Sequence, residues 1–196
     1  MPRPLILASG SLGRHELMKV HGYTFEVKPS HIPEITEARY GDCRQYVGEL
    51  AWLKAQATAA TVNEGIVIAA DTVGWHNGRV IGKPEDEADA RRILRELAGT
   101  THELWTGVCV WLRPGDWQFT WQELSRVRVK DFSPEELDGY IASNKWVGAS
   151  GAYSIEMPND PYLEVVEGTV SNVIGLPMES LAKALEWVGQ AFSLTR

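Results

Sequence analysis

Hydroxyl groups, glycines and an arginine lie together directly after the first apolar run of the chain. The run at residues 5–8 leads into Ser9-Gly10-Ser11-Leu12-Gly13-Arg14, and a helix is expected over residues 14–20. Glycines free the backbone of such a strand-to-helix turn, and the N–H groups and dipole of a helix N-terminus attract phosphate. A plain N-cap turn with a solvated Arg14 fits the same residues, so the turn alone does not decide between the two.

A carboxylate follows a second apolar run. Residues 66–70 (IVIAA) predict a buried strand, and Asp71 and Thr72 come directly after it. Ligand crevices of open α/β sheets lie at the carboxyl ends of strands, where an aspartate can hold a metal ion or activate water. An aspartate that caps a turn, with Thr72 sharing that task, is an equal alternative.

Two lysines and a glutamate are further candidates. Lys54 falls on the apolar face of a helix expected over residues 42–61, where a snorkelling lysine is the alternative. Lys83 lies in Gly82-Lys83-Pro84, which lacks the GxxxxGK[ST] spacing of a phosphate-binding loop. Solvated side chains are the plain interpretation of Lys83 and of the loop residue Glu34.

The other reactive residue types form no recognisable pattern. The five histidines show no HxxxH spacing, and no serine lies in a GxSxG turn. The two cysteines, Cys43 and Cys109, are not part of a CxxC pair. A zinc site, a disulfide framework and a serine hydrolase triad therefore have no support.

The elements that must position these candidates alternate along the chain. Asn77-Gly78 between two short β runs predicts a hairpin, and Ser133-Pro134 predicts a helix start. Strands are expected at residues 5–8, 23–27, 66–70, 73–75, 79–81, 104–112, 119–129 and 162–166, and helices at 14–20, 42–61, 85–97, 133–143 and 177–188. This pattern predicts an α/β fold: a mixed, twisted central sheet with flanking helices in two lobes around a cleft. We expect residues 1–196 to form a single domain.

Composition restricts the partners. The 196 residues are 44% hydrophobic and 23% charged, as in ordinary globular proteins, and the net charge is −7. An acidic surface repels nucleic acid, so no nucleic-acid partner is expected. The N-terminal apolar stretch is too short for a signal peptide and no run is long enough for a membrane span, so we expect a cytoplasmic location and no membrane contact.

Taken together, the motifs resemble the Maf (septum-formation-like) family of nucleoside triphosphate pyrophosphatases, which has the ITPase-like fold. The family patterns appear in order over nearly the whole chain. LASxSPRRxxLL matches residues 7–18, AADTVV matches 69–74, GKP matches 82–84, LSGxxHxVxTGV matches 97–108, AGAYGIQG matches 150–157 and NVVGLP matches 172–177.

The resemblance implies an activity and assigns roles. It implies hydrolysis of a nucleoside triphosphate to the monophosphate and pyrophosphate with a divalent metal, Mg²⁺ or Mn²⁺. The implied metal-binding residues are Asp71 and Glu34, and Asp71 is also the water-activating base. The other implied catalytic residues are Arg14, Lys54 and Lys83, and Ser9 and Ser11 belong to the substrate site. Positive groups there neutralise the charge that spreads over the phosphoryl oxygens in the transition state.

Departures from the family pattern concern the base. The family's Pro-Arg pair is Leu12-Gly13 here, and its glutamine is Glu156. The resemblance places Gly13, Thr72 and Glu156 at base-selecting positions; Thr72 matches a pyrimidine-selecting subgroup and Glu156 a subgroup that acts on 7-methyl-GTP. An ionised glutamate only accepts hydrogen bonds, which suits a guanine edge, and Gly13 is expected to leave room for a purine. We therefore expect guanine-type or 7-methyl-guanine triphosphates to be preferred.

Two other interpretations compete. One is a nucleotide-binding regulator of cell division with little turnover, which the missing arginine at position 13 favours; the other, a nucleic-acid-binding module, conflicts with the net charge. A nucleoside triphosphate is the expected partner, and a homodimer is considered as the assembly.

Overall fold

The computed structural model describes residues 3–32, 42–155 and 160–193. They form a seven-stranded mixed sheet with the strand order β2-β1-β3-β5-β6-β7, and β4 pairs with β3 outside this path. The strands are β1 (Leu5–Leu7), β2 (Phe25–Val27), β3 (Gly65–His76), β4 (Arg79–Ile81), β5 (Thr101–Arg113), β6 (Gln118–Val129) and β7 (Leu163–Glu167). β1 runs parallel to β2 and β3, and the other pairings are antiparallel.

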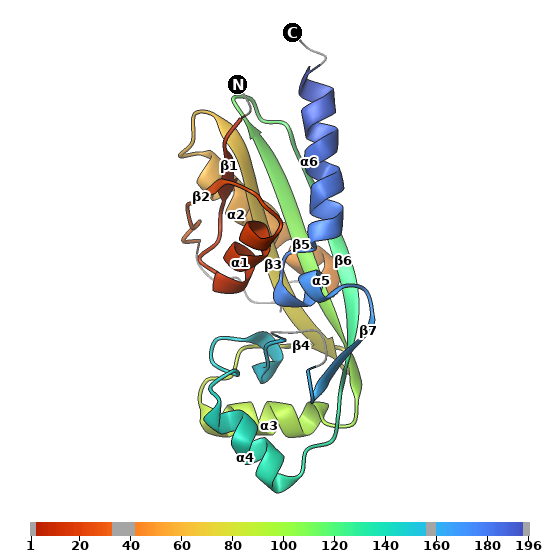
Figure 1. The fold of residues 1–196 in the computed structure, drawn as a ribbon. Coiled ribbons are helices and arrows are strands. Elements are labelled where there is room, and N and C mark those ends of the chain that lie inside the picture. The colour runs from red at the N-terminus through yellow and green to blue at the C-terminus, as the bar shows by residue number, and fades with distance from the viewer. Residues whose placement is uncertain (1–2, 33–41, 156–159, 194–196) are drawn as a thin grey trace.

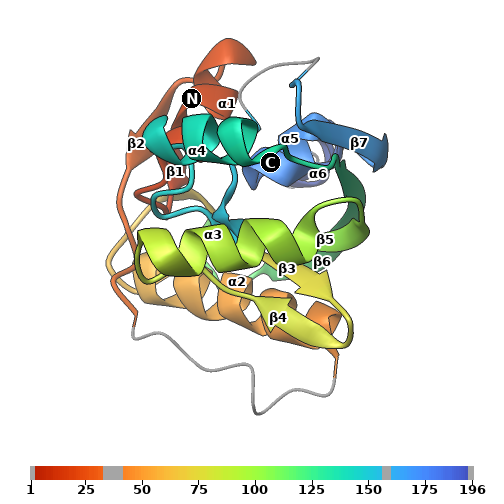
Figure 2. The ribbon, with the colours of Figure 1, turned by 90° about the horizontal axis from the view of Figure 1, so that it is seen from below.

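Helices cover the long strands in two lobes (Figure 1). They are α1 (Leu12–Val20), α2 (Cys43–Ala59), α3 (Glu87–Leu97), α4 (Pro134–Ala142), α5 (Val170–Ile174) and α6 (Met178–Ser193), with a short 3₁₀ turn, η2, at Ser150–Ala152. In the upper lobe, α2 packs on one face of the strands, and α1, α5 and α6 lie on the other (Figures 1 and 2). In the lower lobe, α3, α4 and η2 pack against the far ends of β5 and β6.

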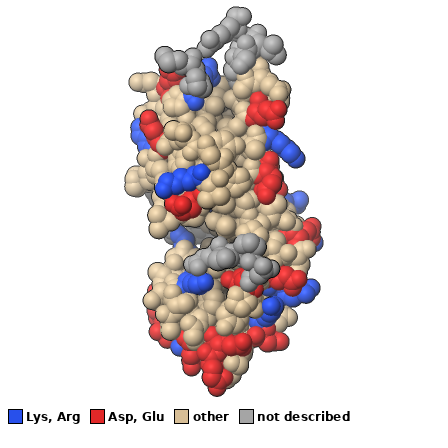
Figure 3. Space-filling model, viewed as in Figure 1, with Lys and Arg blue, Asp and Glu red and all other residues tan. Residues whose placement is uncertain are grey.

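Each lobe has its own apolar core. In the upper lobe, Leu7, Ile68 and Val110 of the sheet belong to one buried cluster with Leu181 of α6, while Ala51 and Ala55 of α2 pack on the opposite face. In the lower lobe, the core joins α3, α4 and the ends of the long strands. Acidic side chains gather at the outer end of this lobe (Figure 3), which leaves the junction between the lobes as the more suitable place for an anion.

Local signals explain the element ends. Asn77 and Gly78 both have positive φ (50° and 78°) in the β3–β4 turn, as a two-residue hairpin requires. Ser133 caps α4, where its side chain accepts from the N–H of Glu136 while the Glu136 side chain accepts from the N–H of Ser133. The expected hairpin, this helix and the fold class are confirmed.

The structure corrects the sequence-based elements in two places. β3 continues through Asp71 to His76 rather than ending before it, because β5 pairs with it from Gly65 to Trp75. α5 and η2 were not predicted, since five and three residues are too few to show a helical period. In the described part of the chain, every helix is too short or too polar to cross a membrane.

Candidate active site

Asp71 and Lys54 form an ion pair between β3 and α2. Lys54 Nζ donates to Asp71 Oδ1, and the two side chains are only 26% and 13% exposed. The Asp71 carboxylate beneath α2 therefore explains why a lysine lies on the apolar face of this helix. A half-buried charge pair is costly to desolvate and adds little to the stability of the fold. Its presence at one edge of the sheet therefore indicates a functional site.

That edge of β3 is open where Asp71 lies. β1 pairs with β3 only at Ile66–Ile68, and β4 pairs with it only at Gly74–His76. Over residues 69–73, no described strand pairs with this edge. Asp71 thus lies just beyond the carboxyl end of the parallel strand β1, which is where open α/β sheets bind ligands. The prediction that Asp71 follows the end of its own strand is wrong, because β3 continues through it and the strand that ends beside it is β1.

Arg14 crosses from α1 to the opposite face of β3. Its Nε donates to Gly175 O at 2.7 Å, one Nη to Ser9 Oγ at 3.1 Å and the other to Thr72 Oγ1 at 3.1 Å. These bonds use three of the five N–H donors of a guanidinium and leave two for a ligand. Burial lowers the pKa of Arg14, and the negative charge of Asp71 opposes that shift. Arg14 thus joins the first turn, β3 and the C-terminal end of α5.

Thr72 begins a chain of hydroxyl hydrogen bonds into the core. Thr72 Oγ1 lies 2.9 Å from Thr106 Oγ1, and the Thr106 hydroxyl donates to Asn172 O at 3.1 Å. Since the Thr106 proton is directed to Asn172 O, the Thr72 proton goes to Thr106 Oγ1 or to Gly175 O, which lies 3.4 Å away. Thr72 Oγ1 therefore accepts from Arg14 and directs its own proton inward.

The turn before α1 supports Arg14. Ser11 is the N-cap of α1, and its Oγ accepts from Arg14 N at 3.4 Å; the N–H of Ser11 donates to Ser9 Oγ at 3.2 Å. At Gly13, a Cβ would lie 2.9 Å from Ile174 Cγ2, so α5 closely approaches this glycine. A side chain at position 13 would meet Ile174, and the expectation that Gly13 leaves room for a purine base stays a prediction.

Lys83 belongs to the other lobe. It lies exposed in the loop after β4, and it makes no hydrogen bond or ion pair with the residues described. The neighbouring Gly82 carbonyl accepts from Gly151 N at 3.0 Å, so the backbone at this loop is held by η2. Glu34 and Glu156, the predicted metal and base-selecting residues, lie outside the described residues.

The donor set at Asp71 suits a hard divalent cation. Within the described ranges, no cluster of three or more His, Cys, Asp or Glu side chains is arranged to hold a metal ion. Mg²⁺, however, is commonly bound by one or two carboxylates together with substrate phosphates. The single carboxylate Asp71 at an open sheet edge fits that mode.

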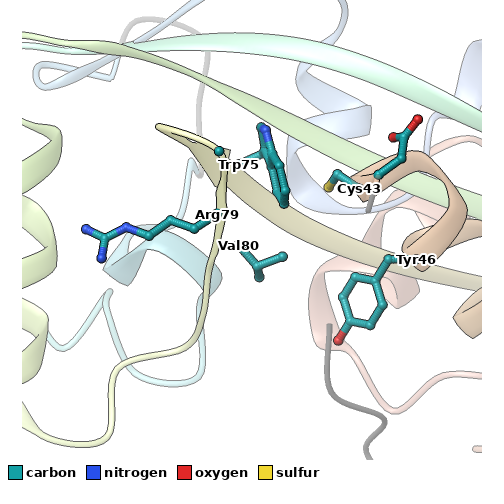
Figure 4. A pocket seen from close by; sticks show the side chains of 7 residues that line it. Cys43, Tyr46, Trp75, Arg79 and Val80 are labelled. Atoms are coloured by element: carbon teal, nitrogen blue, oxygen red, sulfur yellow. The ribbon is translucent and has the colours of Figure 1, made fainter. Parts of the chain in front are cut away.

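A small cavity of about 160 Å³ lies between the start of α2 and the β3–β4 hairpin (Figure 4). The start of α2 lines it with Cys43 and Tyr46, and the β3–β4 hairpin lines it with Trp75 and Val80. Burial, reinforced by nearby carboxylates, raises the pKa of the Cys43 thiol to about 12. The thiol stays protonated near neutral pH, so this cavity offers no thiolate nucleophile.

Sequence reasoning missed Thr106, Gly107, Asn172 and Gly175 as parts of the site. At Gly107, a Cβ would lie 2.2 Å from Val47 O, so this glycine allows α2, and Lys54 with it, to approach the sheet. Gly175 has φ 118° and ends α5 with its carbonyl at Arg14. Both glycines lie inside matched motifs, and a glycine in a strand or after a helix is the signal that could have indicated them.

Comparison with known proteins extends these observations. The family described as "Maf-like protein" matches residues 4–188. The dTTP/UTP pyrophosphatase of Koribacter versatilis is 39% identical over 185 residues and covers 94% of each chain. The dTTP/UTP pyrophosphatase of Rhodopirellula baltica is 36% identical over 190 residues, covering 94% of this chain and 82% of that protein. The solved structure of the Staphylococcus aureus Ham1 protein aligns with a TM-score of 0.44 and 19% identity, covering 65% of this chain and 72% of that one.

Proposed function

Because the chain belongs to the Maf-like protein family, we propose that it hydrolyses nucleoside triphosphates to the monophosphate and pyrophosphate. The observation that supports this most directly is the Lys54–Asp71 pair at the open edge of β3, with Arg14 on the opposite face. The relatives with 36–39% identity over 94% of the chain are named for a pyrophosphatase activity.

Asp71 is the proposed base for the attacking water. Its carboxylate is held from one side by Lys54, which keeps one oxygen oriented and leaves the other for a proton acceptor role. Lys54 is then close enough to the reacting phosphoryl group to stabilise the charge that develops on it.

The positive groups of the site balance an anionic substrate. Arg14 retains two N–H donors beside the N-terminus of α1, and Lys83 is an exposed ammonium on the other lobe. We assign Ser9, Ser11 and Arg14 to one side of the triphosphate and Lys83 to the other. Charge-assisted hydrogen bonds of this kind each contribute about 1.5–3 kcal/mol.

Asp71 is also the proposed ligand of a divalent cation, Mg²⁺ or Mn²⁺, together with Glu34. Such a cation supplies charge neutralisation on the phosphoryl oxygens and lowers the pKa of bound water.

For the base, the relatives' names and the Thr72 hydroxyl both favour a pyrimidine. The Thr72 proton is directed into the protein and its oxygen accepts from Arg14, so a further hydrogen bond to a base would use the one remaining lone pair as an acceptor. An acceptor suits the N3–H of thymine or uracil and not the bare N3 of cytosine. We propose dTTP and UTP as the preferred substrates, rather than the 7-methyl-guanine triphosphate suggested by Glu156.

A substrate panel tests this function. The purified protein is incubated with each common NTP and dNTP and with 7-methyl-GTP, with Mg²⁺ or Mn²⁺, and the products are identified. We expect pyrophosphate and monophosphate, most rapidly from dTTP and UTP, and a loss of about 10²–10⁴-fold in Asp71→Asn. Tight nucleotide binding without turnover would instead support the regulator, and rapid turnover of 7-methyl-GTP alone would overturn the pyrimidine assignment.

A further inference from the structure

The turn η2 carries backbone strain between the two lobes. Gly151 and Ala152 have consecutive positive φ angles of 78° and 58°, and Ala152 is completely buried. A non-glycine residue in the left-handed region costs about 1–3 kcal/mol and persists only where its surroundings hold it firmly. The contacts around η2 therefore indicate which residues keep it in this strained conformation.

Three hydrogen bonds fix the turn and the residues after it. The N–H of Gly151 donates to Gly82 O at 3.0 Å, and the N–H of Ser154 donates to Tyr140 Oη at 3.3 Å. Between them, Tyr153 Oη lies 2.6 Å from His102 Nε2 in the core of the lower lobe. Since His102 is 2% exposed and Tyr153 is 4% exposed, water does not replace this bond.

Counting protons gives the direction of the buried bond. His102 Nδ1 has no hydrogen-bond partner. If the proton of His102 is on Nε2 and donates to Tyr153 Oη, two groups have no partner: the Tyr153 hydroxyl proton and the Nδ1 lone pair. If the Tyr153 hydroxyl donates to Nε2 instead, only the N–H of Nδ1 has no partner. Tyr153 is therefore the donor. Burial, and to a smaller extent the charge of His76, lowers the pKa of His102 to about 4, so Nε2 stays an acceptor at neutral pH.

The turn lies against the loop that carries Lys83. Its hydrogen bond reaches the carbonyl of Gly82, which immediately precedes Lys83, and the Lys83 side chain is solvent-exposed. An exposed lysine has many rotamers, so only its backbone anchor can define where the ammonium reaches. That anchor is η2, and η2 is in turn held from inside the lobe by Tyr153.

We propose that His102 and Tyr153 are positioning residues, which hold η2 against Gly82 and so set the reach of Lys83 toward the triphosphate. This inference rests on the proposed function of Lys83. Neither residue touches the substrate; each acts through the backbone of the turn. Removing the Tyr153 hydroxyl relaxes the turn and spreads the Lys83 ammonium over more positions.

A double-mutant cycle tests the coupling. Tyr153→Phe keeps the ring and removes the hydroxyl, and we expect kcat/KM for dTTP or UTP to fall about tenfold, mainly through KM. In the Lys83→Ala background, Tyr153→Phe should cost almost nothing further. Tyr162→Phe is the matched control, because its ring packs on Phe132 in the same lobe and its hydroxyl makes no hydrogen bond with described residues; wild-type kinetics are expected.

The outcomes separate this inference from the proposed function. An equal loss in both backgrounds means that Tyr153 acts by general destabilisation and overturns the inference while Lys83 keeps its role. Wild-type kinetics in Lys83→Ala removes Lys83 from the site and overturns the inference, although pyrophosphatase activity remains. If Tyr153→Phe does not fold, His102→Gln, which still accepts a hydrogen bond, should keep kcat/KM within about threefold of wild type, and His102→Leu should lose about tenfold. Equal kinetics in those two variants would also contradict the inference.

Discussion

Protonation of His102 should destabilise the protein in mildly acidic solution. The folded pKa of about 4 lies below the ordinary value of 6.5 that the unfolded chain has. Between these values, the unfolded state binds more protons than the folded state. The contribution of neutral His102 to stability is thus complete above pH 6.5 and is lost as pH falls toward 4.

The two pKa values give the size of the effect. The free energy of unfolding should fall by about 0.8 kcal/mol at pH 6, about 2 kcal/mol at pH 5 and about 3 kcal/mol once pH is below 4. Whole domains are stable by only about 5–15 kcal/mol, so a loss of 2 kcal/mol at pH 5 is readily measured.

Urea unfolding of the wild type and of His102→Gln at pH 7, 6 and 5 measures this contribution. The variant is expected to be less stable at pH 7, because it disturbs a packed core, but to lose about 2 kcal/mol less than the wild type between pH 7 and pH 5. Using the difference between the two proteins removes the titration of all other groups. Parallel losses would show that His102 is solvated or already charged in the folded chain, and would refute the argument.

Four further substitutions test the packing and the site. Gly107→Ala places a Cβ 2.2 Å from a backbone oxygen of α2, so it should destabilise the protein by roughly 1–3 kcal/mol and lower activity by displacing Lys54. Gly139→Ala, in α4 with nothing within 4 Å, should instead stabilise it by about 0.5–1 kcal/mol in the same unfolding assay. Lys54→Met should reduce kcat roughly 10²–10³-fold with dTTP or UTP, and retention of turnover would exclude Lys54 from the chemistry. Ser133→Ala removes a capping box and should lower the free energy of unfolding by about 1 kcal/mol with kinetics unchanged.

Local chemistry determined much of the fold from the sequence. The Asn77-Gly78 hairpin and the α4 start at Ser133 depend on positive φ, on capping hydroxyls and on the fixed φ of proline, all of which act within a few residues. Apolar periodicity located the long strands and helices for the same reason, because the buried face of each element shows as a regular spacing of apolar residues along the sequence. The residue types that can carry charge or accept a proton were equally visible, Asp71 and Lys54 among them.

The tertiary structure alone decided how these residues meet. Arg14 donates to Gly175 across 161 positions of sequence, and Thr72 bonds to Thr106 across 34. A hydrogen bond to a distant carbonyl or hydroxyl leaves no period in the sequence. β3 runs on through Asp71 because eleven residues pair with β5, and this non-local pairing overrides the local tendency of Asp-Thr to turn. The site therefore forms where one short strand ends and its neighbour continues, a place set by pairing between strands far apart in the chain.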